Sequence, residues 1–215
     1  MYYHSRAEAG GKLAESLVKY RDDNAIIVAM NAGGVLVGEP ISTSLHCPLT
    51  MLLSEQIDLP GEQIDIGTIS QDGSFVYNNA FSSGEAEEYY SEFHGYIEDQ
   101  KREQLAKMHR LLGRGGLVNK KNLKDHNIIL VSDGLKTGVT LEAAHAFLKP
   151  VDMKSLIIAV PIASVQAVDR MHILADELHC LSVTDNYIET NHYYDDNNVP
   201  TQEVILQKLS NFGTD

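Results

Sequence analysis

The residues best suited to chemistry lie between Ile128 and Thr140, where the sequence reads I-I-L-V-S-D-G-L-K-T-G-V-T. A run of aliphatic residues, typical of a buried strand, ends at Ser132 and Asp133, and a loop rich in glycine and hydroxyl groups leads into a helical pattern. Such a junction directs backbone N–H groups and the positive end of the helix dipole toward one point. The pattern predicts a binding site for a phosphate monoester.

Several residues of this loop have predicted roles. Thr137 and Thr140 offer hydroxyl donors, and the glycines let the backbone approach a ligand closely. Asp133, at the end of the strand, is placed to accept hydrogen bonds from ribose hydroxyls. Lys136 is a candidate cation for the phosphate, and a solvated loop lysine is an equally good explanation. The predicted phosphate- and ribose-binding residues are Ser132, Asp133, Gly134, Leu135, Lys136, Thr137, Gly138, Val139 and Thr140.

Composition limits the classes of function. The 215 residues are 43% hydrophobic, which suits one folded α/β domain covering 1–215. No apolar run could cross a membrane and the N-terminus lacks a signal-peptide core, so we expect a cytoplasmic protein with no membrane partner. A formal net charge of -13 opposes nucleic acid as a partner. No metal-binding spacing occurs among the histidines, and Cys47 and Cys180 are expected to be buried free thiols.

The order of apolar patterns predicts alternating strands and helices. A compact apolar run at 25–30, a turn, a helix at 35–45 and a strand at 49–53 form a βαβ unit, which implies a parallel sheet. Asp72-Gly73 between two β-like runs indicates a hairpin, and Ser82 with Glu85 has capping-box spacing before a long helix. We expect one doubly wound, mainly parallel sheet, with residues from about 64 to 116 forming a hood of a hairpin and a helix beside the site.

The loop resembles the 5-phosphoribosyl-1-diphosphate (PRPP) loop of type I phosphoribosyltransferases. In that family a hydrophobic strand is followed by two acidic residues and x-x-x-T-G-x-T. Here Ser132 and Asp133 take the two acidic positions, and Thr137, Gly138 and Thr140 match the loop. A strand–loop–helix junction alone would be weak support, because such junctions recur throughout α/β proteins.

The resemblance is strongest to a bacterial and archaeal subgroup of predicted phosphoribosyltransferases and extends over most of the chain. It includes Arg6-x-x-Ala9-Gly10 near the N-terminus, Gly33-Gly34-Val35 after the first strand, and Val160-Pro161-Ile162-Ala163 after the loop. These motifs are individually common, and their order and spacing carry the identification.

The resemblance implies transfer of the phosphoribosyl group of PRPP to an unknown acceptor in nucleotide metabolism. It implies Mg²⁺ bound together with PRPP and not by direct protein ligation, with Asp133 as the one possible exception. It also implies Asp133 as the candidate catalytic residue, and a homodimer. Gly33, Gly34 and Arg114 are the weaker candidates for contact with the diphosphate. Tyr77, Tyr187 and Tyr193 could stack on a base, although core or surface roles explain each of them better.

Three charged features of the family's site are absent. The family usually has Pro-Arg-Gly-Gly where this chain has Asn31-Ala32-Gly33-Gly34, and Arg-Lys where it has Ser54-Glu55. Ser132 replaces the first acid, and Glu55 would repel a diphosphate if it pointed into the site. Cations stabilise the charge that grows on a leaving diphosphate, so these changes weaken the diphosphate end. A catalytically weakened or inactive nucleotide- or PRPP-binding regulatory protein is therefore the alternative, and a different α/β phosphate-binding enzyme ranks last.

Overall fold

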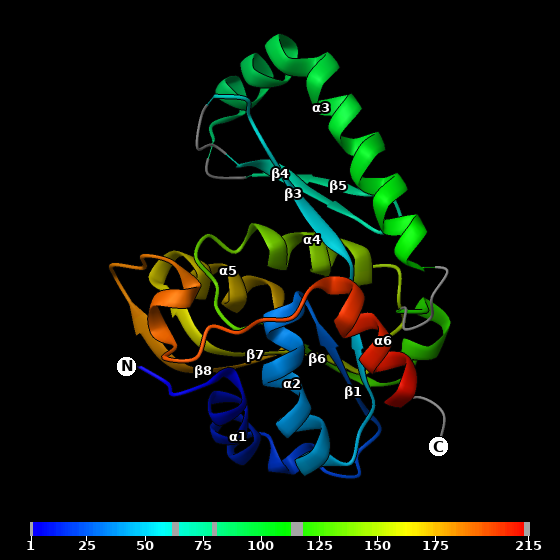
Figure 1. Ribbon diagram of the computed structural model, residues 1–215, viewed down its shortest axis with the longest axis vertical. Helices are drawn as coiled ribbons and strands as arrows, with labels where there is room; N and C mark the ends of the chain where they lie inside the picture. Colours follow the sequence, from blue (N-terminus) through cyan, green and yellow to red (C-terminus); the bar gives the residue numbers. More distant parts are fainter. Residues whose placement is uncertain (1, 62–64, 79–80, 113–117, 213–215) are drawn as a thin grey trace.

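The centre of the protein is a parallel sheet of five strands in the order β2-β1-β6-β7-β8. The computed structural model describes residues 2–61, 65–78, 81–112 and 118–212 (Figure 1). Every residue of β1 and β6 is buried, as expected for strands that are covered on both faces. The five strands are β2 (Leu49–Met51), β1 (Ala25–Ala29), β6 (Asn127–Val131), β7 (Ser155–Ser164) and β8 (Glu177–Thr184).

Helices cover both faces of this sheet (Figure 1). On one face, α1 (Arg6–Ser16) and α2 (Ala32–Leu45) pack on alternate strand residues such as Ile27. On the other, α4 (Val139–Leu148) and α5 (Val165–Leu174) pack on the residues between them, such as Val28. The predicted doubly wound sheet is confirmed, and the aliphatic runs of the sequence are its central strands.

The order of the strands creates a crevice between β1 and β6. From β1 the chain passes through α2 to β2, and from β6 it passes through α4 to β7, so the two crossovers leave in opposite directions. The two strands are parallel, and Ala29 at the end of β1 pairs with Val131 at the end of β6. Ligands of doubly wound proteins bind at such a switch point, outside the carboxyl ends of the strands.

A second sheet and a long helix form the hood, which projects from the core at the top of Figure 1. Its antiparallel strands are β3 (Ser54–Asp58), β4 (Asp65–Ser70) and β5 (Phe75–Tyr77), and α3 (Ser83–Leu112) packs against β3 and β4. The expected hairpin joins β4 and β5. The predicted capping box is confirmed, because Ser82 and Glu85 exchange hydrogen bonds. The hood starts at β3, earlier than predicted. The sequence did not reveal this strand, because only Ile57 of its five residues is buried and the strand has no clear apolar pattern.

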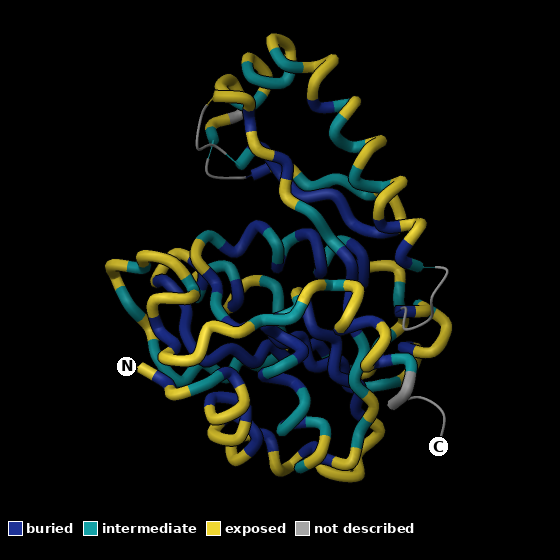
Figure 2. Tube along the Cα trace, viewed as in Figure 1, coloured by how far each residue is buried: buried dark blue, intermediate teal, exposed yellow. Residues whose placement is uncertain are grey.

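The C-terminal part of the chain returns across the core. Helix α6 (Gln202–Phe212) places Ile205, Leu206 and Leu209 in the same apolar cluster as the hood strands. Short 3₁₀ helices occupy Val18–Tyr20, Lys120–Leu123 and Thr190–Tyr193. Figure 2 shows that the central strands are buried whereas much of α3 is exposed. Within the described ranges, no helix combines the length and apolar character that crossing a membrane requires.

The two cysteines are free thiols but are less buried than predicted. Cys47 follows the end of α2, and Cys180 lies in β8, the edge strand of the sheet. Both are half-buried, because an edge strand and a helix end are covered by fewer neighbours than a central element. Burial still raises the pKa of the Cys47 thiol to about 11 and also raises that of Cys180.

Candidate functional site

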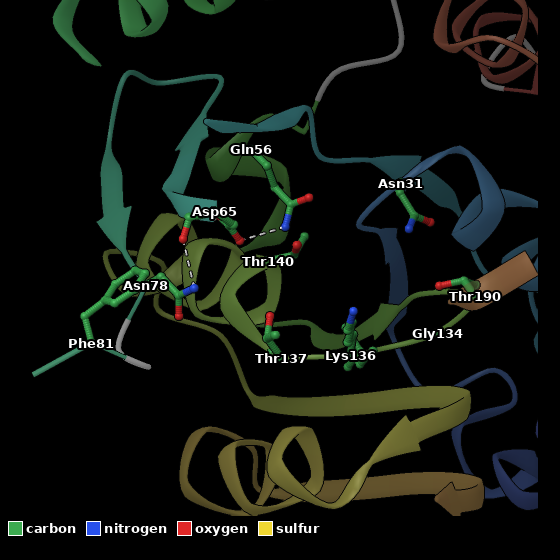
Figure 3. A pocket seen from close by; sticks show the side chains of 12 residues that line it. Asn31, Gln56, Asp65, Asn78, Phe81, Gly134, Lys136, Thr137, Thr140 and Thr190 are labelled. Carbon is green, nitrogen blue, oxygen red and sulfur yellow. Dashed lines mark hydrogen bonds between the residues drawn. The ribbon is translucent and has the colours of Figure 1, made fainter. Parts of the chain in front are cut away.

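A cavity of about 460 Å³ opens at the switch point, between the loop that follows β6 and the inner face of the hood (Figure 3). This volume is in the range of small-molecule sites. The cavity is lined by residues of the predicted phosphate loop, by two further residues of the core and by residues of the hood region. They are Gly134, Leu135, Lys136, Thr137, Gly138 and Thr140 with Asn31 and Thr190 on the core side, and Gln56, Asp65, Asn78 and Phe81 on the hood side.

The middle of the loop is fixed to the end of β7. The N–H of Leu135 donates to the carbonyl of Ile162 over 3.1 Å, and the carbonyl of Leu135 accepts from the N–H of Ser164 over 2.9 Å. The Ser164 hydroxyl also donates to the carbonyl of Lys136. These bonds hold the loop in one conformation before any ligand binds, so ordering it costs little when a ligand arrives.

The amides that remain available lie in the second half of the loop. The N–H of Gly134 donates to the Ser132 hydroxyl over 3.4 Å, and that of Leu135 is taken by β7. Within the described residues, no protein acceptor is found for the N–H groups of Lys136, Thr137 or Gly138. Fewer amides of the loop are therefore available to an anion than predicted, because protein atoms already accept the N–H groups of Gly134 and Leu135.

Helix α4 begins without a side-chain cap. Gly138 is its N-cap residue, with φ 79° and ψ 5°, a left-handed conformation that glycine adopts without strain. By contrast, Ser5, Asn31 and Ser164 each accept a backbone hydrogen bond at the start of α1, α2 and α5. An uncapped helix N-terminus that faces a cavity is suited to bind a phosphate group.

Three side chains of the loop add polar groups that could bind a phosphate in the cavity. Lys136 is exposed and points into the cavity, as do the hydroxyl-bearing side chains of Thr137 and Thr140 (Figure 3). Lys136 is the one basic residue among the described residues that line the cavity. Val139 is fully buried beneath the loop and supports the helix from the core.

Asp133 does not line the cavity. Its side chain is only 8% exposed, and Oδ2 lies 2.7 Å from Nε of Arg6 in a buried ion pair. Its Oδ1 accepts a hydrogen bond from Nδ2 of Asn31 over 3.0 Å. Both carboxylate oxygens therefore have protein partners, and the contact of Asp133 with ribose hydroxyls stays a prediction.

Arg6 joins three distant parts of the chain. Besides its bond to Asp133, its Nη2 donates to Oδ1 of Asn191 over 2.7 Å. Its guanidinium lies 4.4 Å from the ring centroid of Tyr194, whose hydroxyl donates to the main-chain carbonyl of Asp133. The sequence showed Arg6 as part of a motif without a role, and its position on the same helix face as Ala9 and Leu13 was the available signal.

The N-terminus of α2 is capped by a side chain of the protein at one amide. Oδ1 of Asn31 accepts the N–H of Gly34 over 2.5 Å. A Cβ atom on Gly33 would lie 2.0 Å from Oδ2 of Asp133, and one on Gly34 would lie 2.7 Å from the carbonyl of Val131. These glycines allow α2 to pack closely against the loop after β6, and neither lines the cavity. Their contact with a diphosphate stays a prediction.

Glu55 points away from the cavity. It accepts a hydrogen bond from Nε2 of Gln202 over 2.9 Å and lies 3.7 Å from Nζ of Lys107. Its neighbour Gln56 lines the cavity instead, because successive residues of a strand face opposite sides. The anticipated repulsion between Glu55 and a diphosphate therefore does not arise. Arg114, the other candidate for that group, lies outside the described residues.

The side chains around Asp133 do not fit a Mg²⁺ ion. The guanidinium of Arg6 already pairs with its carboxylate, and a divalent cation there would face that positive charge. Ser132, in the first acidic position, offers a neutral hydroxyl. Among the described residues, no group of three or more His, Cys, Asp or Glu side chains could hold a metal ion.

The hood supplies the opposite wall of the cavity. Oδ2 of Asp65 accepts from Nε2 of Gln56 over 3.0 Å, and its Oδ1 accepts from the N–H of Gly67 over 2.9 Å. Nδ2 of Asn78 donates to the main-chain carbonyl of Asp65 over 2.9 Å, and Phe81 completes the wall (Figure 3). Burial raises the pKa of the Asp65 carboxyl to about 6. No spacing in the sequence singled out these residues of the wall, because they meet only through the hairpin.

The tyrosines considered for base stacking lie elsewhere. Tyr77 packs against Tyr90 in the hood, and Tyr187 and Tyr193 pack against each other. The Tyr187 hydroxyl bonds to Thr190 and would lie 2.2 Å from a Cβ atom on Gly134. None of the three lines the cavity, so the core and surface roles describe them better.

Comparison with known proteins agrees with the geometry. A family model described as "Phosphoribosyl transferase domain" matches residues 2–198. Two proteins from strains of Mycobacterium tuberculosis, Rv0571c and MT0597, which carry only a provisional description as phosphoribosyl transferases, are 26% identical over 182 residues, or 84% of this chain. This chain spans only 40% of their length.

A solved structure supports the same relationship. The crystal structure of TT1426 from Thermus thermophilus superposes with a TM-score of 0.72 at 26% sequence identity, and the match covers 98% of this chain and 100% of that one. The family match covers most of the chain, and the observed sheet with its hood is the fold that the sequence resemblance implies. The chain belongs to the type I phosphoribosyl transferase domain family.

Proposed function

We propose that this chain binds the ribose 5-phosphate unit of PRPP, with the phosphate at the N-terminus of α4, and transfers the phosphoribosyl group to an acceptor that is not yet identified. The observation that supports this most is the uncapped start of α4, where Lys136, Thr137 and Gly138 line the cavity and no protein acceptor is found among the described residues for their N–H groups. The helix dipole and these donors favour a doubly charged phosphate there.

The residues around the cavity have different proposed roles in binding. The amides, the Thr137 and Thr140 hydroxyls and the Lys136 ammonium hold the phosphate, and Asp133 is a positioning residue that fixes the start of the loop through Arg6 and its own carbonyl. In the transfer, the bond from the anomeric carbon to the diphosphate oxygen breaks and a bond to the acceptor forms. Mg²⁺ enters as part of the PRPP complex rather than as a resident of the protein.

A second candidate function is binding of a phosphorylated ribose without efficient transfer. The closed α2 terminus favours it, because Asn31 occupies the N–H of Gly34 that would otherwise be available to a diphosphate. Ala32 supplies no cation at the same place. Loss of one such donor costs roughly 10²–10³ in rate in other enzymes that stabilise a developing anion.

Thermal unfolding tests the binding step that both functions share. Ribose 5-phosphate at about 100 times its Kd stabilises a protein by about 2.7 kcal/mol, whereas ribose without a phosphate should give no comparable rise in Tm. Inorganic phosphate serves as the control for a simple anion effect. Equal shifts with ribose and ribose 5-phosphate would contradict a phosphate site at α4.

Release of diphosphate from PRPP separates the two functions. Transfer predicts release that depends on an added nucleobase or other nucleophile, and it predicts a phosphoribosylated product by mass spectrometry. Stabilisation by ribose 5-phosphate without diphosphate release from any acceptor would favour the binding protein.

A further inference from the structure

The cavity has one acidic and one basic side chain among its described lining residues, and they belong to opposite walls. Lys136 comes from the phosphate loop, and Asp65 comes from β4 of the hood (Figure 3). The loop itself contributes no carboxylate to the cavity, because Ser132 replaces one acid and Asp133 is bonded to Arg6 and Asn31. A ligand whose phosphate lies at α4 would therefore meet its only acidic contact in this lining at the hood.

Asp65 is held in place from several sides. Gln56 on β3 and the N–H of Gly67 each donate to one of its carboxylate oxygens. The charge of Asp58, also on β3, acts with burial to raise the pKa of Asp65, while Lys136 is the cation across the cavity. Each carboxylate oxygen has two lone pairs, so both can accept another hydrogen bond from a ligand.

We propose that Asp65 determines which acceptor the site takes, by accepting hydrogen bonds from the N–H groups of a nitrogen heterocycle next to the ribose. This assignment rests on the proposed function, because it places the heterocycle on the far side of the ribose from the phosphate. A carboxylate accepts and cannot donate, so it favours an amino or ring N–H group over a carbonyl or a methylated nitrogen.

The neighbours of Asp65 support a planar ligand with polar edges. The carboxamides of Gln56 and Asn78 lie beside Asp65, and the ring of Phe81 forms an apolar side of the same wall. A few placed polar groups next to an aromatic surface are typical of sites that orient a small ligand. A flat heterocycle matches this wall better than an aliphatic acceptor does, because it offers a π-face to Phe81 and N–H groups to the carboxylate.

Calorimetric titration of the full chain with four probes tests the proposal. Ribose 5-phosphate reports the phosphate site, GMP and AMP add bases with N–H donors, and N6,N6-dimethyl-AMP adds a base without them. We expect GMP or AMP to bind at least about tenfold more tightly than ribose 5-phosphate and than the dimethylated nucleotide, a difference of about 1.4 kcal/mol.

Asp65→Asn identifies the residue responsible. The variant should lose that tenfold preference and retain its affinity for ribose 5-phosphate. Glu87→Gln is the matched control, because it removes one negative charge from an exposed position of α3 that does not line the cavity, and this variant should keep the preference. A circular dichroism spectrum of each variant checks that the fold is retained.

The possible failures are distinct. If ribose 5-phosphate binds but Asp65→Asn keeps the preference for N–H-bearing bases, or if wild type has no such preference, the role of Asp65 is wrong and the phosphate site stands. If ribose 5-phosphate does not bind to wild type, the proposed function fails and the role of Asp65 fails with it.

Discussion

Two neighbouring strand–helix junctions of this protein begin level with each other and differ in what satisfies the helix N-terminus. At the β6–α4 junction, α4 begins at Gly138 without a side-chain cap, next to a cavity that Gly138 and Thr140 line. At the β1–α2 junction, the Asn31 side chain accepts the N–H of Gly34, and the glycines pack against Asp133 and Val131. A ligand can use the first terminus, whereas the protein uses the second. The comparison supports the proposed phosphate site at α4 and shows that a side chain of the protein caps the N-terminus of α2.

The buried ion pair between Arg6 of α1 and Asp133 gives the largest expected effect on stability. Arg6 and Asn31 both bind the Asp133 carboxylate, so Arg6→Met leaves a buried negative charge between α2 and α4. Loss of one partner of a buried ion pair typically costs about 3–5 kcal/mol, and we expect the free energy of unfolding in urea to fall by that amount.

Arg21→Met is the matched control for Arg6. Arg21 is exposed and donates to the main-chain carbonyl of Ser44 at the surface. Its replacement should cost less than about 1 kcal/mol. Equal losses from the two variants would show that the buried Arg6–Asp133 ion pair does not contribute specially to stability.

The open junction can be blocked by a carboxylate. Thr137→Glu puts a negative charge beside the uncapped N-terminus of α4, where it competes with a phosphate but interacts well with the helix dipole. We expect affinity for ribose 5-phosphate to fall by at least about 100-fold, or 2.7 kcal/mol, while Tm holds or rises. Thr43→Glu introduces the same charge at an exposed position of α2 and should leave binding within about twofold of wild type. Undiminished binding to Thr137→Glu would place the phosphate elsewhere.

The closed junction can be opened at its cap. Asn31→Ala removes the acceptor for the Gly34 N–H and also the amide that donates to Asp133. Loss of an N-cap side chain typically costs about 1 kcal/mol, and the lost hydrogen bond to the carboxylate adds to it, so we expect stability to fall by more than about 1 kcal/mol. Chemical denaturation measures this loss. The freed N–H of Gly34 could then donate to the diphosphate of PRPP. We therefore expect the affinity for PRPP to rise relative to the affinity for ribose 5-phosphate. A variant as stable as wild type would mean that Asn31 does not cap α2.

The hood gives the smallest effect, which concerns pH and stability. The pKa of Asp65 is raised by burial from 3.8 to about 6, so the folded state holds this proton more tightly than the unfolded state does. The unfolded state then binds fewer protons between about pH 4 and pH 6, and stability falls as pH rises through that window. Asp65→Asn cannot titrate, so its Tm should decline less than that of wild type over this range. Parallel Tm curves would contradict a raised pKa.

The sequence was most informative where function depends on neighbouring residues. The sheet, the hairpin and the phosphate loop all follow from local patterns, because aliphatic runs, Asp-Gly and T-G-x-T each have a direct backbone consequence. Asn31 and Glu55 were recognised as departures from the family, but their effects depend on where their side chains point, which the sequence does not show. Asn31 caps its own helix, and Glu55 faces Gln202 rather than the cavity.

The rest could not be predicted because it depends on contacts between distant segments. Arg6 reaches Asp133 across 127 positions of the chain. Asp65, Gln56 and Asn78 meet only after β3, β4 and β5 pair, and β3 itself carries too little apolar pattern to be recognised. Polar residues that converge through tertiary structure leave no periodic signal in a single sequence.

Calorimetric titration with ribose 5-phosphate and with PRPP, each in the presence and absence of Mg²⁺, tests the contrast between the open and the closed junction most directly. If the phosphate end is open and the diphosphate end is filled, ribose 5-phosphate binds and PRPP gains less than about tenfold, or 1.4 kcal/mol, with or without the metal. Binding of PRPP more than about 100-fold tighter than ribose 5-phosphate, or no binding of ribose 5-phosphate at all, would contradict it.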